Sequence, residues 1–257
     1  MKREPPDEIA DLCKAFAAGL SGILGPKLVG VTIYGAAAFP ESFAIIDVDF
    51  HVVVSEELNG REKLEIGKLH RDLAAAFPPL GVELDGYYIL LEDVTKSDPP
   101  KSQMWAEATD DSWALHREHI RAGRQISLYG QDLRSIYPAA TWEELELALE
   151  SELYFVEKNL AKDPAYCILN LCRLVYSFET GDVVISKAAA AEWAAAEMAE
   201  WKSLIDMAVR SYLGETSQQD HYIMQSEAAN MLDAAKKNIG ESRKGANEPD
   251  SKRMSEL

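Results

Sequence analysis

Two hydrophobic repeats alternate along the first half of the chain. From residue 7 to 24, and again from 60 to 77, apolar side chains recur at helical spacing, which predicts amphipathic helices. Shorter stretches rich in β-branched residues predict buried strands. The predicted strands are residues 28–34, 48–54 and 82–91, with one more at 125–129. Strands that alternate with helices in this order indicate a layered α/β domain.

The pattern becomes almost wholly helical after Pro138. Thr141 and Glu144 have the spacing of a capping box, in which the threonine caps a helix and the glutamate reaches back to it. The one β signal in this half is the short run 182–185. The predicted helices are residues 142–160, 164–179, 187–207 and about 217–237.

These patterns divide the chain into three parts. Residues 1–138 form an α/β domain and residues 139–240 an all-α domain. The last stretch, 241–257, is polar and predicts a disordered tail.

The formal net charge is −17, from 43 acidic and 26 basic residues. Proteins that bind nucleic acid without sequence preference rely on basic surfaces, so we expect no nucleic-acid partner. An acidic surface attracts a cationic small molecule, although acidity alone also maintains solubility. The charge leaves both explanations open.

Three features bear on location. No apolar run reaches the length needed to cross a bilayer, and the N-terminal residues lack the apolar core of a signal peptide. Cys13, Cys167 and Cys172 have neither metal-ligand nor Cys-x-x-Cys spacing. Buried thiols are typical of a reducing compartment. We therefore expect a cytoplasmic protein with no membrane partner.

Candidate chemistry begins with Asp47 and Asp49, at the start of the predicted strand 48–54. Strand alternation would place both carboxylates on one face of the sheet. Two acidic groups this close repel each other unless a cation lies between them, and Mg²⁺ commonly binds one or two carboxylates together with substrate phosphates. An Asp-x-Asp pair alone is a weak signal, because many strand-end aspartates only face solvent.

The next strand carries two more acids, Glu83 and Asp85, which again share a face. If that strand lies beside the first, one of them joins the pair, as two-metal attack on a phosphoryl group requires. Gly35 precedes the loop that leads to Asp47, and a glycine there lets the backbone approach a phosphate. His51 shares the face of Asp49, but a structural histidine is at least as good an interpretation.

This order of motifs resembles the aminoglycoside nucleotidyltransferases of the streptomycin/spectinomycin adenylyltransferase type, within the polymerase-β-like nucleotidyltransferase superfamily. The resemblance runs from about residue 10 to about residue 225. The family pattern Tyr-Gly-Ser, loop, Asp-x-Asp appears here as Tyr34-Gly35-Ala36 and Asp47-Val48-Asp49. The family's third carboxylate, usually glutamate, falls on Asp85. The helical half matches through Asp163, Arg173, Thr180-Gly181, Ser186-Lys187, Trp193 and Tyr212.

The resemblance implies an α+β fold, with a mixed sheet in the N-terminal domain and a helical bundle after it. It also implies transfer of AMP from ATP to a hydroxyl of an aminoglycoside-type antibiotic, with release of pyrophosphate and with two Mg²⁺ ions. ATP and the acceptor, a cationic small molecule, would bind in a cleft between the two domains. We expect a monomer.

The same resemblance assigns roles to individual residues. Asp47 and Asp49 would hold metal, and Asp85 would be the general base or a third ligand, with Glu83 as its substitute. Gly35 and Ala36 would lie near the phosphates. The ATP phosphates would contact Arg173, Lys187 and Tyr212, and the antibiotic would contact Asp163 and Trp105. Apart from the resemblance, the negative charge of Glu83 would also attract a cationic antibiotic.

Two departures from the family pattern keep alternatives open. Ala36 and Ile46 stand where the family usually has serine. One lost hydrogen bond to a charged phosphate costs about 1.5–3 kcal/mol, which lowers activity without abolishing it. The alternatives are a different acceptor, small molecule or protein, and a nucleotide-binding protein with weak catalysis. Arg173 could also be a surface arginine paired with Glu179 or Glu152.

Overall fold

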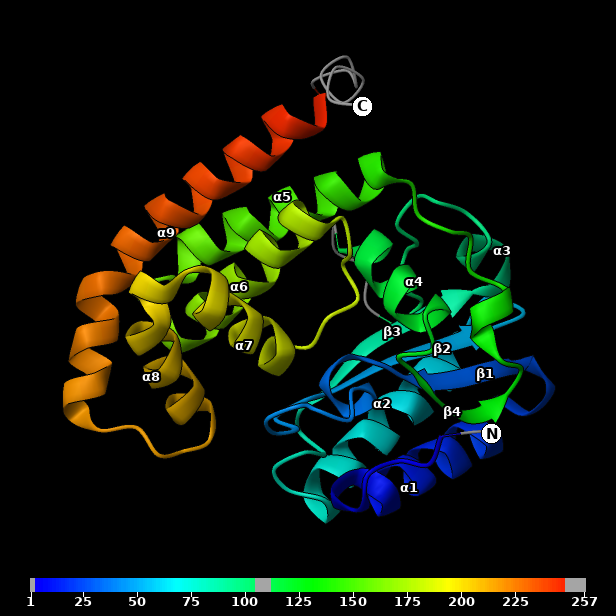
Figure 1. Cartoon of the computed structure of the whole chain (residues 1–257). Coiled ribbons are helices and arrows are strands. Elements are labelled where there is room, and N and C mark those ends of the chain that lie inside the picture. Colours follow the sequence, from blue (N-terminus) through cyan, green and yellow to red (C-terminus); the bar gives the residue numbers. More distant parts are fainter. Residues whose placement is uncertain (1–2, 105–111, 248–257) are drawn as a thin grey trace. The chain divides into compact units, whose positions relative to one another are not determined.

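The computed structural model describes residues 3–104 and 112–247, and Figure 1 shows the path of the chain. The chain forms two compact units, residues 1–148 and 149–257. The division falls inside helix α5 (Trp142–Asn159), whereas the sequence predicted a domain boundary at residue 138. The pattern marks where helical spacing begins, and a division within one continuous helix leaves no such mark.

A mixed four-stranded sheet forms the centre of the first unit. Its strand order is β3-β2-β1-β4, in which β2 runs parallel to β3 and β1 runs antiparallel to both β2 and β4. The strands are β1 (Leu28–Ile33), β2 (Val48–Val54), β3 (Leu84–Leu90) and β4 (Ile126–Gly130). The predicted α+β fold with a mixed sheet is confirmed.

Helices cover both faces of this sheet (Figure 1). α1 (Asp7–Leu24) and α2 (Gly60–Ala76) pack on the face that carries Phe50. α3 (Leu91–Val94) and α4 (Trp113–Arg121) contribute to a second cluster on the face that carries Val53. Successive side chains of β2 therefore enter different cores, as strand geometry requires.

Helix α1 shows how composition can mislead about membranes. Among the residues that the structure describes, Asp7–Lys27 is the one span long and apolar enough to cross a bilayer, with a mean hydropathy of 1.2. This corrects the prediction that no run reaches that length. Its buried side chains belong to the sheet core: Ile9, Leu12, Cys13, Phe16, Leu20 and Leu24. Such packing is what a core helix shows.

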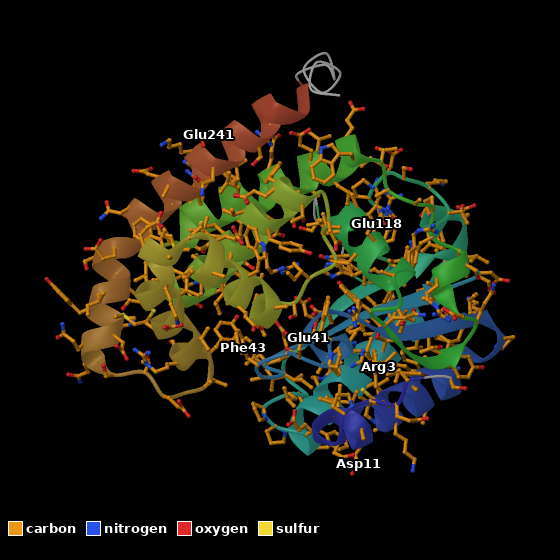
Figure 2. The ribbon with its side chains drawn as sticks, in the orientation of Figure 1. Arg3, Asp11, Glu41, Phe43, Glu118 and Glu241 are labelled. Carbon is orange, nitrogen blue, oxygen red and sulfur yellow. The ribbon has the colours of Figure 1, made fainter. Side chains whose placement is uncertain are left out.

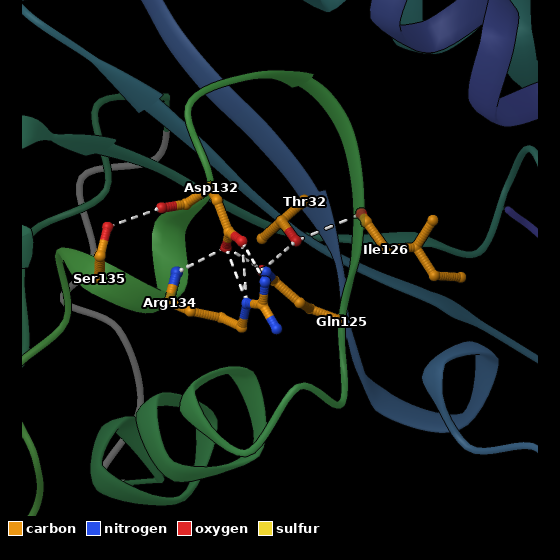
Figure 3. A network of polar contacts seen from close by, with 6 residues as sticks. All are labelled: Thr32, Gln125, Ile126, Asp132, Arg134 and Ser135. Atoms are coloured by element: carbon orange, nitrogen blue, oxygen red, sulfur yellow. Dashed lines mark hydrogen bonds and ion pairs between the residues drawn. The ribbon is translucent and has the colours of Figure 1, made fainter. Parts of the chain in front are cut away.

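A network of hydrogen bonds connects β1 to the residues on both sides of the edge strand β4 (Figure 3). The buried Thr32 hydroxyl donates to Gln125 Oε1 (2.9 Å), and Gln125 Nε2 donates to Asp132 Oδ1 (2.6 Å). Arg134 donates to the same carboxylate from its backbone N–H (3.1 Å) and from Nε (3.0 Å). The Arg134 side chain is the main reason why the pKa of Asp132 falls to about 2.

Helix α4 holds the segment that leads into α5. Arg117, which is fully buried, donates from Nη2 to Glu144 Oε1 (2.8 Å). Glu118, labelled in Figure 2, accepts the Ala140 N–H (2.8 Å). The capping box is confirmed, because Glu144 accepts the Thr141 N–H (2.7 Å) while the Glu144 N–H donates to Thr141 Oγ1 (3.2 Å).

The second unit is a bundle of helices around α6, whose side chains are mostly buried. Two of its ion pairs join α9 to α5, between Lys236 and Glu157 (2.5 Å) and between Arg243 and Glu150 (2.7 Å). Cys167 and Cys172 are free and buried, as expected, and Cys13 of the first unit is also free and buried. The helices of the second unit are α6 (Pro164–Thr180), α7 (Lys187–Glu197), α8 (Lys202–Tyr212) and α9 (Gln218–Asn247), together with the end of α5.

The structure differs from the predicted helices at two places. The predicted helix 187–207 is broken at Met198, which has φ −114° and ψ 61° and is buried. No proline or glycine marks this break, so packing rather than local preference sets it. Helix α9 continues to Asn247, into the predicted tail, while residues 248–257 lie outside the described part of the chain. The run 182–185 forms no strand.

Candidate active site

The parallel register of β2 and β3 sets the first part of the site. Asp49 of β2 and Asp85 of β3 are Cα partners, and the Val48 N–H donates to the Glu83 carbonyl (2.8 Å) just outside the ladder. Paired residues in neighbouring strands project to the same face, about 5 Å apart. The sequence offered Asp85 and Glu83 as partners of the aspartate pair, and the register places Asp85 opposite Asp49. Asp49 is half-buried, and Asp85 and Glu83 are exposed.

Asp47 is held differently. It occupies a bend directly before β2, so the alternation of the strand does not fix the direction of its half-buried side chain. Within the described residues, no group of three or more His, Cys, Asp or Glu side chains is placed to hold a metal ion. The backbone thus brings Asp49 and Asp85 to neighbouring positions. Among the described residues, these two carboxylates and that of Asp47 do not form a three-ligand metal site.

Gly35 and Asp49 are matched to each other. Gly35 has φ +63°, and a Cβ atom built on it would lie 1.7 Å from Asp49 Oδ2. The preceding residue, Tyr34, donates its backbone N–H to the Asp49 carbonyl (3.0 Å). A glycine is therefore required at position 35 both for its left-handed backbone and for the space that the Asp49 carboxylate occupies.

The turn that begins at Gly35 is short and largely buried. Residues Gly35–Ala38 form one 3₁₀ turn, with Ala36 half-buried and Ala37 and Ala38 buried. Arg3, labelled in Figure 2, donates from Nη1 to the Ala38 carbonyl. The turn is thus tied at its start to Asp49 and at its end to the N-terminal segment.

His51 is a structural histidine, the interpretation that the sequence left open. It is fully buried on the face of Asp49, and its Nδ1 is hydrogen-bonded to the Tyr137 hydroxyl (2.9 Å). Burial, and to a lesser degree the nearby His116, lower the pKa of His51 well below its usual range. Burial of His51 therefore favours the neutral imidazole over the charged form.

The second unit brings two of the predicted phosphate ligands together. Lys187, the first residue of α7, donates from Nζ to the Tyr212 hydroxyl (3.0 Å) near the end of α8. The same Nζ lies 4.0 Å from the centroid of the Tyr166 ring and 5.2 Å from that of Tyr212. Two aromatic faces around one ammonium form a cation–π site. Sequence reasoning missed Tyr166.

A signal for Tyr166 was present in the spacing of α6. It stands seven residues before Arg173, which is two helical turns, so both residues lie on one face of the helix. Arg173 is half-buried. In the part of the chain that the structure describes, no ion pair joins it to Glu179 or Glu152, the partners considered from the sequence.

The predicted antibiotic contacts have mixed outcomes. Asp163 is exposed and caps α6, because its Oδ1 accepts the Tyr166 N–H (3.1 Å). Glu83 is exposed directly before β3. Trp105 lies outside the described residues. The role of these three side chains in acceptor binding stays a prediction.

Comparisons with known proteins agree with this picture. Residues 138–238 match the family model described as the aminoglycoside adenylyltransferase C-terminal domain. A spectinomycin 9-adenylyltransferase from Enterococcus faecalis is 26% identical over 210 residues, which cover 74% of this chain and 81% of that protein. One from Staphylococcus aureus is 26% identical over 215 residues, covering 75% and 81%.

A solved structure extends the likeness to the fold. Spectinomycin adenyltransferase AAD(9) from Enterococcus faecialis, crystallised with ATP and spectinomycin, matches with a TM-score of 0.69 and 21% identity. The match covers 88% of this chain and 98% of that one. The resemblance to the streptomycin/spectinomycin adenylyltransferases that the motifs indicated is therefore confirmed, together with the fold class.

Proposed function

We propose that this protein transfers AMP from ATP to a hydroxyl of an aminoglycoside-type antibiotic, with spectinomycin or streptomycin as the acceptor. The observation that carries the proposal is the pairing of Asp49 with Asp85 beside the Gly35 turn. Two-metal transfer of AMP needs acidic groups that hold the metal ions at the reacting phosphate, and this register supplies two carboxylates. The similarity to known spectinomycin adenylyltransferases supports the same reaction.

The donor set fits divalent metal. Carboxylate oxygens are the ligands that Mg²⁺ prefers, and it commonly uses only one or two of them, completing its shell with substrate phosphates and water. Asp49 and Asp85 share a face and Asp47 lies two residues away, so these three residues would hold two Mg²⁺ ions. When bound, the ions would neutralise charge that develops on the phosphate.

Asp85 is proposed as the general base. The acceptor hydroxyl gives its proton to this exposed carboxylate as the oxygen attacks the α-phosphorus of ATP. A new P–O bond forms to the antibiotic, and the bond between the α- and β-phosphates breaks. Pyrophosphate leaves with its bonding electron pair, so atoms and charge balance. Gly35 and Ala36 would offer backbone N–H groups near the phosphates.

The helical unit would bind the triphosphate. Lys187 offers an ammonium already placed by Tyr212 and Tyr166, and Arg173 offers a planar fork on the face of α6 that carries Tyr166. In this proposal residues 1–138 carry the chemistry and residues 139–240 supply nucleotide contacts. The match of residues 138–238 to the adenylyltransferase C-terminal domain supports that assignment.

The acceptor would be recognised through charge. Aminoglycoside-type antibiotics are cationic and hydroxylated, and a protein of net charge −17 attracts them. Asp163 and Glu83 expose carboxylates, and Trp105 would stack on a sugar face. The proposal includes a monomer that acts in the cytoplasm without a nucleic-acid partner, and the three free buried thiols support the reducing compartment.

The test is a panel of acceptors with purified protein, ATP and Mg²⁺. Pyrophosphate release is followed, and the antibiotic is examined by mass spectrometry for an added AMP. We expect release that depends on spectinomycin or streptomycin and disappears in Asp49→Asn. Tight ATP binding without release, or AMP transfer to a protein instead of an antibiotic, would contradict the proposal and favour one of the alternatives.

A further inference from the structure

A cluster of aromatic and imidazole rings lies on the sheet face of Asp49 and Asp85, one step further along each strand. We call these six residues the ring cluster. Its members come from β2, β3, α4, the residue directly after β1 and the segment after β4: Tyr34, His51, Tyr87, Trp113, His116 and Tyr137. Neither the sequence motifs nor the proposed reaction gives this cluster a role.

His116 has the most informative position in the ring cluster. Its ring centroid lies 4.9 Å from that of Tyr34, 5.6 Å from His51 and 6.4 Å from Tyr87. Tyr34 directly precedes Gly35, and His51 and Tyr87 each follow a proposed catalytic aspartate by two residues. One helical side chain thus contacts every segment that carries the proposed chemistry in the first unit.

Tyr34 links His116 to the backbone of the Gly35–Ala38 turn. Its hydroxyl is hydrogen-bonded to His116 Nδ1 (3.3 Å), and its side chain is buried. Its own N–H is bonded to the Asp49 carbonyl (3.0 Å), and Gly35 follows with the Asp49 carboxylate against its Cα. A rotation of Tyr34 would therefore move both the turn and the space that Asp49 occupies.

We propose that His116 is a positioning residue: through the Tyr34 hydroxyl it fixes the Gly35–Ala38 turn against Asp49 in the arrangement that binds ATP. This inference rests on the proposed function for its kinetic part. Its structural part, the rigidity of the turn, is independent of the reaction.

The test uses three variants that separate hydrogen bonding from packing. Tyr34→Phe removes one hydroxyl, and His116→Phe keeps a ring of similar size. His116→Asn restores a hydrogen-bonding atom near the position of Nδ1. We expect Tyr34→Phe and His116→Phe to raise the KM for ATP by roughly twofold to tenfold, the range of one net hydrogen bond, with the acceptor KM unchanged. His116→Asn should recover most of this loss.

The chain contains a matched control on the other face of the sheet. His70 Nε2 is hydrogen-bonded to the Tyr88 hydroxyl (2.8 Å), so this pair, like His116 and Tyr34, joins a half-buried helical histidine to a buried tyrosine. Tyr88→Phe should lower the unfolding temperature about as much as Tyr34→Phe does. It should leave the KM for ATP unchanged, because that face carries none of the proposed catalytic groups.

Amide hydrogen exchange supplies a readout that needs no activity. We expect the N–H groups of residues 35–39 to exchange roughly twofold to tenfold faster in Tyr34→Phe and His116→Phe, but not in Tyr88→Phe. The double variant should equal either single variant, because both remove the same bond. Unchanged exchange in the turn would overturn the inference. Faster exchange in a protein that transfers no AMP would reject the proposed function and retain the positioning role.

Discussion

The two units prepare their proposed ligands in different ways. In the first unit, backbone register places Asp49 opposite Asp85, and a glycine backbone makes room for one of them. In the second, Lys187 is held by side-chain contacts from two other helices, through Tyr166 and Tyr212. The first arrangement depends on main-chain geometry and the second on packing between helices. Substitutions that disturb the two carboxylates of the first unit should therefore mainly lower kcat, and substitutions around Lys187 should mainly raise the KM for ATP.

The largest expected effect is that of Gly35→Ala. The added Cβ would displace the Asp49 carboxylate, and a misplacement of about 1 Å at a reacting centre costs about a hundredfold in rate. Pyrophosphate release at saturating ATP and spectinomycin measures this loss in kcat.

Gly25→Ala is the matched control for that substitution. Gly25 also has a positive φ, of +52°, but an added Cβ would meet nothing within 4 Å. It should lose stability, because a side chain strains a backbone with positive φ, and it should keep its activity. Equal activity losses in both variants would show that backbone strain, not the Asp49 contact, explains the effect.

Lys187→Met should have the next largest effect, and mainly on binding. The variant keeps an unbranched side chain but removes the ammonium, which is proposed to contact the phosphates. Loss of a hydrogen bond to a charged group costs about 1.5–3 kcal/mol, so the KM for ATP should rise about tenfold or more. Lys202→Met, which removes an exposed partner of Asp206, is the control and should leave this KM unchanged.

Tyr166→Leu should have a smaller effect on the same constant. The leucine removes one of the two aromatic faces that surround Lys187 Nζ, while Tyr212 still accepts its hydrogen bond. A cation–π contact at a partly exposed site is worth about 0.5–1 kcal/mol, so we expect a rise of about two- to fivefold in the KM for ATP. A rise in the acceptor KM instead would place Tyr166 at the antibiotic.

The smallest expected effect concerns acid stability of the sheet. Asp132 has its pKa lowered to about 2, so its contribution is fully present above about pH 4 and is lost as pH falls through about 2. Because its side chain is 43% exposed, solvent screening limits this contribution to about 1 kcal/mol or less. Urea unfolding at pH 5 and pH 2.5 should show that Asp132→Asn loses less stability on acidification than the unaltered protein. An equal loss would contradict this role.

The strand positions of the first unit could be predicted from the sequence, but the fit between Gly35 and Asp49 could not. β-Branched runs and their spacing predicted β2 over its observed length, and alternation placed Asp49 and Asp85 correctly once the strands were neighbours. The mutual fit of Gly35 and Asp49 was not visible, because it depends on a backbone angle and a distance in space. Spacing alone suggested only that the glycine would face a phosphate.

Packing between helices was harder to predict. Alanine-rich sequence predicted one helix where the chain breaks at buried Met198, since local preference carries no information about a neighbouring helix. Tyr166 shares a face with Arg173, but nothing in the sequence indicated that Lys187 would lie over its ring. Residues that meet only through tertiary packing had to be found in the structure.

The most direct test of the central claim compares Asp85→Asn with the unaltered protein in one assay, pyrophosphate release with ATP, Mg²⁺ and spectinomycin. The substitution keeps the size of the side chain at the exposed register position opposite Asp49 and removes its charge and basicity. If Asp85 is the base, kcat should fall by about 10²–10⁴-fold, the usual contribution of general-base catalysis, while ATP still binds. An unchanged kcat in a variant that folds normally would contradict the account.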